Sequence, residues 1–217
     1  MNNCPVIVLA SSSGDLEAVS ELLSALPAKC DAALIVVQRF DAGSPRLLIE
    51  AFGKRTMLQV LQAHDDAVAE PGHVYVMPAN SSLTMGGDRI RVAANASVRH
   101  PADILLTSLA EEQGNKAIGV VLSGGGSDGA LGIRAIRRHG GATFAQHPGS
   151  SRFPSMPISS IETGCVDFVL RPNEIAQQLI RLSRAALSGR VAPGALGRRV
   201  EFDEAMALPV SALARSA

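Results

Sequence analysis

The chain has few aromatic residues, few cysteines and no excess of either charge. It contains no tryptophan and one tyrosine, and its three cysteines are Cys4, Cys30 and Cys165. Their odd number and wide spacing, without a Cys-x-x-Cys or Cys/His ligand pattern, predict reduced thiols and argue against a disulfide framework or a structural metal site. Lysine plus arginine (20) equal aspartate plus glutamate (20), so no overall charge favours a nucleic acid partner or an acidic membrane surface.

Long hydrophobic runs are missing as well. No apolar stretch approaches the ~20 residues of a membrane-spanning helix, and the first residues, Met1 to Pro5, lack the basic segment of a signal peptide. We therefore expect a soluble, cytoplasmic protein without membrane insertion. The length of 217 residues suits one domain of ordinary size.

Short apolar runs, most of them followed by amphipathic segments, make up the first 187 residues. This alternation predicts an α/β fold, with a doubly wound, mostly parallel sheet that has helices on both faces. Turn residues within 73–92 predict an inserted β-hairpin. The expected strands are 6–10, 33–37, 73–77, 117–122, 142–146 and 166–170, and the expected helices are 15–26, 45–53, 101–113, 128–139 and 172–187. Residues 1–187 are thus expected to form the domain, and 188–217 a C-terminal tail or linker.

Serine and glycine residues follow two of the expected strands at the point where each strand ends. Ser11-Ser12-Ser13 follows the run 6–10, and a segment with four glycines, 123–129, follows the run 117–122 and includes Asp128. The carboxyl ends of parallel strands share one rim of a sheet, so the loops 11–15, 38–44, 123–129 and 147–157 should meet there. A serine, an aspartate and open backbone amides are most of an acyl-transfer site, which also needs a general base.

Simpler interpretations of the same residues stay open. Ser12 and Asp128 are residue types that favour helix N-caps. The segment Gly124-Gly125-Gly126 is compatible with a tight turn or with a phosphate-binding loop, although the Lys-Ser/Thr pair of a P-loop is missing.

Further motifs of the chain are similar to those of a known protein family. They are Ala10-Ser11-Ser12-Ser13-Gly14, the segment Glu70 to Pro78, Arg99-His100-Pro101 with Asp103, the segment Gly119 to Gly129, and Met156-Pro157. With these motifs the chain resembles, over about residues 5–185, the catalytic domain of the CheB-type receptor-glutamate methylesterases of chemotaxis, especially those fused to a methyltransferase. The resemblance implies a hydrolase that needs no metal or organic cofactor. It acts in signal transduction on a methylated chemoreceptor or a related signalling protein, and its oligomeric state stays undetermined.

The resemblance also implies roles for individual residues. Ser12 falls on the nucleophile of the family's Ser-His-Asp triad and Asp128 on its aspartate, while Ser13 and Gly125 fall on the positions whose amides form the oxyanion hole. Met156 belongs to the expected loop 148–157, beside the substrate path.

The position of the family's histidine, directly after Gln38, holds Arg39 in this chain. A guanidinium has no acceptor lone pair and cannot take the proton of Ser12, so we expect Arg39 to pair with Asp128 instead. Two interpretations follow. The chain is a methylesterase in which another residue, such as His147, supplies the base, or it is a catalytically inactive pseudoenzyme that binds a receptor or signalling partner.

Overall fold

The computed structural model describes residues 4–12, 15–38, 45–94 and 98–187 of the chain. Its main element is a seven-stranded sheet with the order β10-β9-β8-β1-β2-β5-β3, in which all neighbouring strands run parallel. The strands are β1 (Val6–Ser11), β2 (Ala33–Gln38), β3 (Gln59–Gln62), β5 (His73–Val76), β8 (Ile118–Val121), β9 (Ala142–Gln146) and β10 (Phe168–Leu170).

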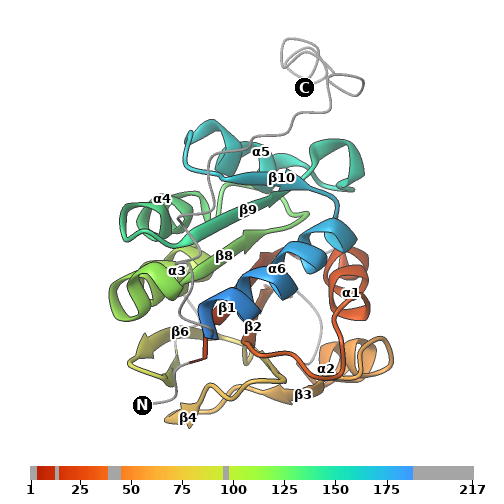
Figure 1. Cartoon of the computed structure of the whole chain (residues 1–217), viewed down its shortest axis with the longest axis vertical. Coiled ribbons are helices and arrows are strands. Elements are labelled where there is room, and N and C mark those ends of the chain that lie inside the picture. The colour runs from red at the N-terminus through yellow and green to blue at the C-terminus, as the bar shows by residue number, and fades with distance from the viewer. Residues whose placement is uncertain (1–3, 13–14, 39–44, 95–97, 188–217) are drawn as a thin grey trace.

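Helices cover both faces of this sheet (Figure 1). Every residue of β1, β2, β8 and β9 is buried, which explains why these strands appear in the sequence as continuous apolar runs. The predicted doubly wound α/β fold is confirmed. One face carries α1 (Leu16–Ser24), α2 (Pro45–Gly53) and α6 (Pro172–Leu187), and the other carries α3 (Pro101–Gln113), α4 (Ala130–Arg138) and α5 (Ser155–Glu162).

A second, antiparallel sheet packs on α3. It consists of β4 (Ala67–Val68), β6 (Ser81–Gly86) and β7 (Arg89–Ala94) in the order β4-β7-β6. It contacts the helix through Met85, whose backbone N–H donates to Ser108 Oγ at 3.0 Å. The predicted hairpin is therefore present but shorter than 73–92, because residues 73–76 form strand β5 of the main sheet.

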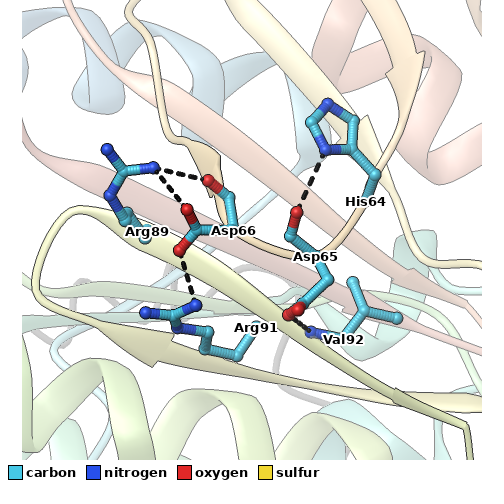
Figure 2. Close-up of polar contacts among 6 residues, drawn as sticks. All are labelled: His64, Asp65, Asp66, Arg89, Arg91 and Val92. Atoms are coloured by element: carbon cyan, nitrogen blue, oxygen red, sulfur yellow. Dashed lines mark hydrogen bonds and ion pairs between the residues drawn. The ribbon is translucent and has the colours of Figure 1, made fainter.

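The turn before β4 fastens this small sheet (Figure 2). Asp66, with a φ of 64°, accepts a hydrogen bond from Arg89 Nη1 at 2.9 Å and forms an ion pair with Arg91. Its neighbour Asp65 accepts the backbone N–H of Val92 at 3.0 Å. The side chains of the turn thus connect to three residues of β7, and the turn follows β3, the edge strand of the main sheet.

The prediction of a loop over residues 148–157 is only partly correct. Only part of it is irregular, because a short 3-10 helix spans Pro148–Ser150 and α5 begins at Ser155. Pro154 is the N-cap of α5 and Pro157 lies in its first turn, where proline removes no needed N–H. The strands β3 and β4 and the helix α5 were not predicted.

The topology fixes where a site can form. Strand β1 lies between β2 and β8, and the chain leaves β1 through α1 toward β2 but returns to the other side of β1 much later, at β8. Ligands of open α/β sheets bind at such a switch point, beyond the carboxyl ends of the two strands. Within the described ranges, no helix is both long enough and apolar enough to cross a membrane.

Candidate active site

Ser12 directly follows β1, and residues of β2 and of the loop after β8 hold it. Its Oγ accepts the backbone N–H of Gly125 at 2.8 Å, and its backbone carbonyl accepts Gln38 Nε2 at 3.3 Å. Helix α1 begins with Asp15 as its N-cap, whose side chain accepts the N–H of Glu17 at 3.1 Å. Ser12 is therefore not the N-cap that the sequence left open, and its hydroxyl faces the loop after β8.

Gly124 makes the close approach between these two loops possible. A Cβ at this position would lie 2.2 Å from Met156 Sδ and 2.9 Å from both the N and the Oγ of Ser12. Two backbone hydrogen bonds join the same loop to the start of α5, from Gly124 N to Phe153 O at 2.8 Å and from Met156 N to Gly124 O at 2.9 Å. Only glycine fits here without displacing the serine or the methionine.

A buried polar network supports the loop from behind. Ser123, which has no exposed surface, donates its backbone N–H to Gln146 Oε1 at 2.8 Å and accepts the N–H of Phe153 on its Oγ at 2.9 Å. Gln146 in turn donates from Nε2 to the carbonyl of Ser150 at 2.9 Å. Because each of these buried groups has a partner, the network holds the Gly125 amide in a defined place.

Asp128 caps the helix that contains Asp103, and Asp103 caps the helix that follows Asp128. The two carboxylate oxygens of Asp128 accept the N–H groups of Ala102 and Asp103 in the first turn of α3, at 3.1 and 3.0 Å. Asp103 Oδ1 accepts the N–H groups of Gly129 and Gly132 at the start of α4, both at 2.9 Å. Asp128 thus does not cap its own helix, as the sequence had left open, but the helix packed beside it.

Burial and hydrogen bonding act in opposite directions on the pKa of the Asp128 carboxyl. Loss of hydration raises the pKa of this carboxyl above its ordinary value, while the backbone N–H groups of Asp103 and Ala102 and the nearby His100 oppose that rise. The amide hydrogen bonds therefore favour an ionised carboxylate in a place where water is partly excluded.

His100 lies next to both aspartates. Its Nδ1 is 3.9 Å from Asp103 Oδ2 and 4.0 Å from Asp128 Oδ1, and 54% of its side chain is exposed. The sequence indicated only a residue before a helix, since Pro101 follows it. Its place in the motif Arg99-His100-Pro101 with Asp103 was the signal that could have pointed to the site.

Residues from loops far apart in the sequence line one hollow, which we call the Ser12 pocket. Its volume is about 460 Å³, and among its lining residues are Ser12, Arg99, His100, Gly125, Asp128 and Met156. The structure thus brings together four of the residues singled out in the sequence, Ser12, Gly125, Asp128 and Met156. Met156 belongs to α5 rather than to a loop, and its side chain is buried.

Other expected site residues are not part of this arrangement. Arg39 and Ser13 lie outside the described residues, and so does the expected pairing of Arg39 with Asp128. His147 follows β9 at the same edge of the sheet, but it caps the 3-10 helix, where its Nδ1 accepts the N–H of Gly149 at 3.1 Å.

A metal ion is the other chemistry to consider at this site. His100, Asp103 and Asp128 can each offer one ligand atom, all within 4.8 Å of one another. However, both carboxylates already accept two backbone N–H groups at helix N-termini, where the helix dipole supplies positive charge. Three of the four carboxylate oxygens therefore already accept N–H groups.

Comparisons with known proteins agree with this geometry. A putative protein-glutamate methylesterase/protein-glutamine glutaminase of Leptospira interrogans is 31% identical over 192 residues, covering 87% of this chain and 100% of the relative. The protein-glutamate methylesterase FrzG of Myxococcus xanthus is 34% identical, with 82% and 54% covered. A protein-glutamate methylesterase/protein-glutamine glutaminase of Moorella thermoacetica is 31% identical, with 83% and 45% covered. The chain thus spans about half the length of the last two.

A solved structure and a family model give the same result. The catalytic domain of the CheB methylesterase of Thermotoga maritima superimposes with a TM-score of 0.76 at 29% identity, covering 82% of this chain and 98% of that one. The family model for CheB methylesterase matches residues 7–179. The chain therefore belongs to the CheB methylesterase family.

Proposed function

We propose that this chain hydrolyses glutamyl methyl esters on chemoreceptors, with Ser12 as the nucleophile. The single observation that carries the proposal is the hydrogen bond from the Gly125 backbone N–H to Ser12 Oγ, 2.8 Å long, at the edge of the Ser12 pocket. A donor so close to the attacking oxygen lies next to the place where an ester carbonyl would become an oxyanion. Such preorganised donors supply a large share of the rate enhancement in acyl transfer.

The reaction would follow the two halves of serine esterase chemistry. Ser12 Oγ bonds to the ester carbonyl carbon, and the carbonyl electron pair moves to oxygen, where the amides of Gly125 and Ser13 stabilise the charge. The intermediate collapses with loss of methanol, and water then attacks the acyl-enzyme to give a free glutamate side chain. The role of Ser13 comes from the family resemblance.

Asp128 is suited to orient the proton acceptor. The N–H groups of Ala102 and Asp103 fix its carboxylate in the pocket wall, so it can hold a neighbouring cationic or N–H-bearing group in one orientation. The base itself cannot be Arg39, because a guanidinium has no acceptor lone pair.

The arginine at position 39, where the family has its histidine, favours a second candidate function. In this alternative the chain is a pseudoenzyme that binds a receptor or partner through the Ser12 pocket without turnover. Methanol release from methylated receptor separates the two. We expect wild type to release methanol, Ser12→Ala to lose at least ~10³-fold in rate, and Arg39→His to exceed wild type. If wild type and Ser12→Ala release the same background amount while both still bind receptor, the pseudoenzyme is the correct function.

A further inference from the structure

We propose that His100 is the general base of this site, accepting the proton of Ser12 while Asp128 and Asp103 orient its ring. The inference rests on the proposed function, because it assigns the missing partner of the Ser12 nucleophile. It goes beyond the family pattern, which places a histidine at the position of Arg39.

The positions of the five histidines lead to this choice, since all five lie within the described residues. His73 begins β5 and so lies at the amino edge of the main sheet, opposite the site. His64 lies in the turn that fastens the small sheet, where its ring contacts the Asp65 carbonyl (Figure 2). Neither can reach Ser12.

The remaining three histidines lie at the end of α4, after β9 and before α3. His139 ends α4, about 13 Å along the helix from the amino end that faces the pocket, and its ring contacts Ala135 O. His147 caps the 3-10 helix and uses Nδ1 there. Of the five histidines, His100 is the one that lines the Ser12 pocket.

The surroundings of His100 fit the task. Its Nδ1 faces two carboxylates at 3.9 and 4.0 Å, which favours a proton on Nδ1 and leaves Nε2 as the acceptor. The charged groups around it are Asp103 and Asp128 from the starts of α3 and α4, and Arg99, which lines the same pocket. Backbone amides hold the carboxylates in place, whereas the imidazole ring is half-exposed and can rotate. A small rotation brings the ring into hydrogen-bond range of Asp128.

The proton taken from Ser12 can be passed on to the leaving methanol without any added reactant. As the bond between Ser12 Oγ and the carbonyl carbon forms, the hydroxyl proton passes to His100 Nε2, directly or through one water. The imidazolium is stabilised by the two carboxylates, and the proton returns to the ester oxygen as the bond to the methoxy group breaks and methanol leaves. A water molecule repeats the cycle on the acyl-enzyme.

The test measures how fast a fluorophosphonate labels Ser12 across pH 5 to 9, since this probe reports an activated serine hydroxyl. We expect His100→Gln to lose ~10²-fold or more of the wild-type labelling rate, and its rate to vary less with pH than that of wild type. Thermal unfolding should show that His100→Gln remains folded, because the amide hydrogen bonds of Asp128 do not depend on the imidazole. The matched control is His147→Gln, which should label within about twofold of wild type.

Each outcome decides between distinct alternatives. Labelling of His100→Gln at the wild-type rate overturns the role of His100 but leaves Ser12 as the nucleophile. A wild type that is not labelled at Ser12 overturns the proposed function and this inference together. Loss of labelling with EDTA and its recovery with a divalent cation would assign His100 and the two aspartates to a metal centre, which also overturns the inference.

Discussion

Asp103 and Asp128 exchange hydrogen bonds across two helices. The carboxylate of Asp128 accepts the N–H of Asp103, and the carboxylate of Asp103 accepts the N–H of Gly129, the residue after Asp128. The two helix N-termini are therefore joined directly beside the Ser12 pocket, and neither aspartate can move without releasing the other's helix. The pocket wall is built on this junction rather than on a loose loop.

We predict that Asp103→Ala lowers the free energy of unfolding by about 2–3 kcal/mol, because two N–H groups at the start of α4 lose their acceptor. Urea denaturation measures this. Asp65→Ala is the control, since Asp65 accepts one N–H at an exposed site, and its loss should stay below about 1 kcal/mol. Equal losses in both variants would show that the junction adds no more stability than one exposed hydrogen bond.

A second prediction concerns the contact of Gly124 with Ser12. Gly124→Ala should reduce ester hydrolysis by ~10²-fold or more, because the added Cβ must displace Ser12 Oγ or Met156 Sδ. Gly125→Ala adds the same methyl group one residue later, where no atom lies within 4 Å, so its loss in rate should be much smaller. Steady-state kinetics on both variants check this, and similar losses would mean that the loop rearranges freely.

The raised pKa of Asp128 predicts a pH dependence of stability. The folded state holds the proton of this carboxyl more tightly than the unfolded state, whose pKa is near 3.8, so its contribution to folding is complete below that value and is lost as pH rises through the raised pKa. The free energy of unfolding of wild type minus that of Asp128→Asn should therefore fall as pH rises above 3.8, the ordinary pKa of the carboxyl. A difference that stays constant or rises with pH would contradict the assignment to burial.

Two ion pairs should differ in their contribution to stability. Asp167 is buried, accepts both the N–H and the Oγ–H of Thr143, and pairs with Arg137 at 2.8 Å. Arg137→Met leaves this carboxylate without its cation and should cost about 2–3 kcal/mol in chemical denaturation. Arg91→Met removes a partner of Asp66 at a half-exposed site and should cost less than about 1 kcal/mol. A larger loss for Arg91→Met would reverse this order.

Among the strands of the main sheet, the sequence predicted those with two buried faces. Strands β1 and β8 carry continuous apolar runs, and the rule that their carboxyl ends share a rim brought Ser12, Gly125 and Asp128 together. Strand β3 was missed because it lies at the sheet edge with mostly exposed side chains.

The features that were not predicted from the sequence depend on contacts between distant elements. Helix α5 was missed because its prolines resemble loop signals. His100 was missed because it lies beside Asp128 only when α3 and α4 pack side by side (Figure 1). No periodicity within either helix indicates that Asp128 would cap α3 and not its own helix. The part of the site formed by Arg39 and Ser13 remains a prediction.

The hydrogen bond between Ser12 and Gly125 joins residues 113 positions apart. During synthesis at about 5–20 residues per second, Ser12 would leave the ribosome many seconds before its partner loop exists. Strand β1 likewise pairs with β8 only after most of the chain has been made, and such long-range parallel pairing is slow to form. A nascent or truncated chain that ends before β8 therefore carries the serine but not the chemistry, so reactivity at Ser12 should arise late, with the closing of the central sheet.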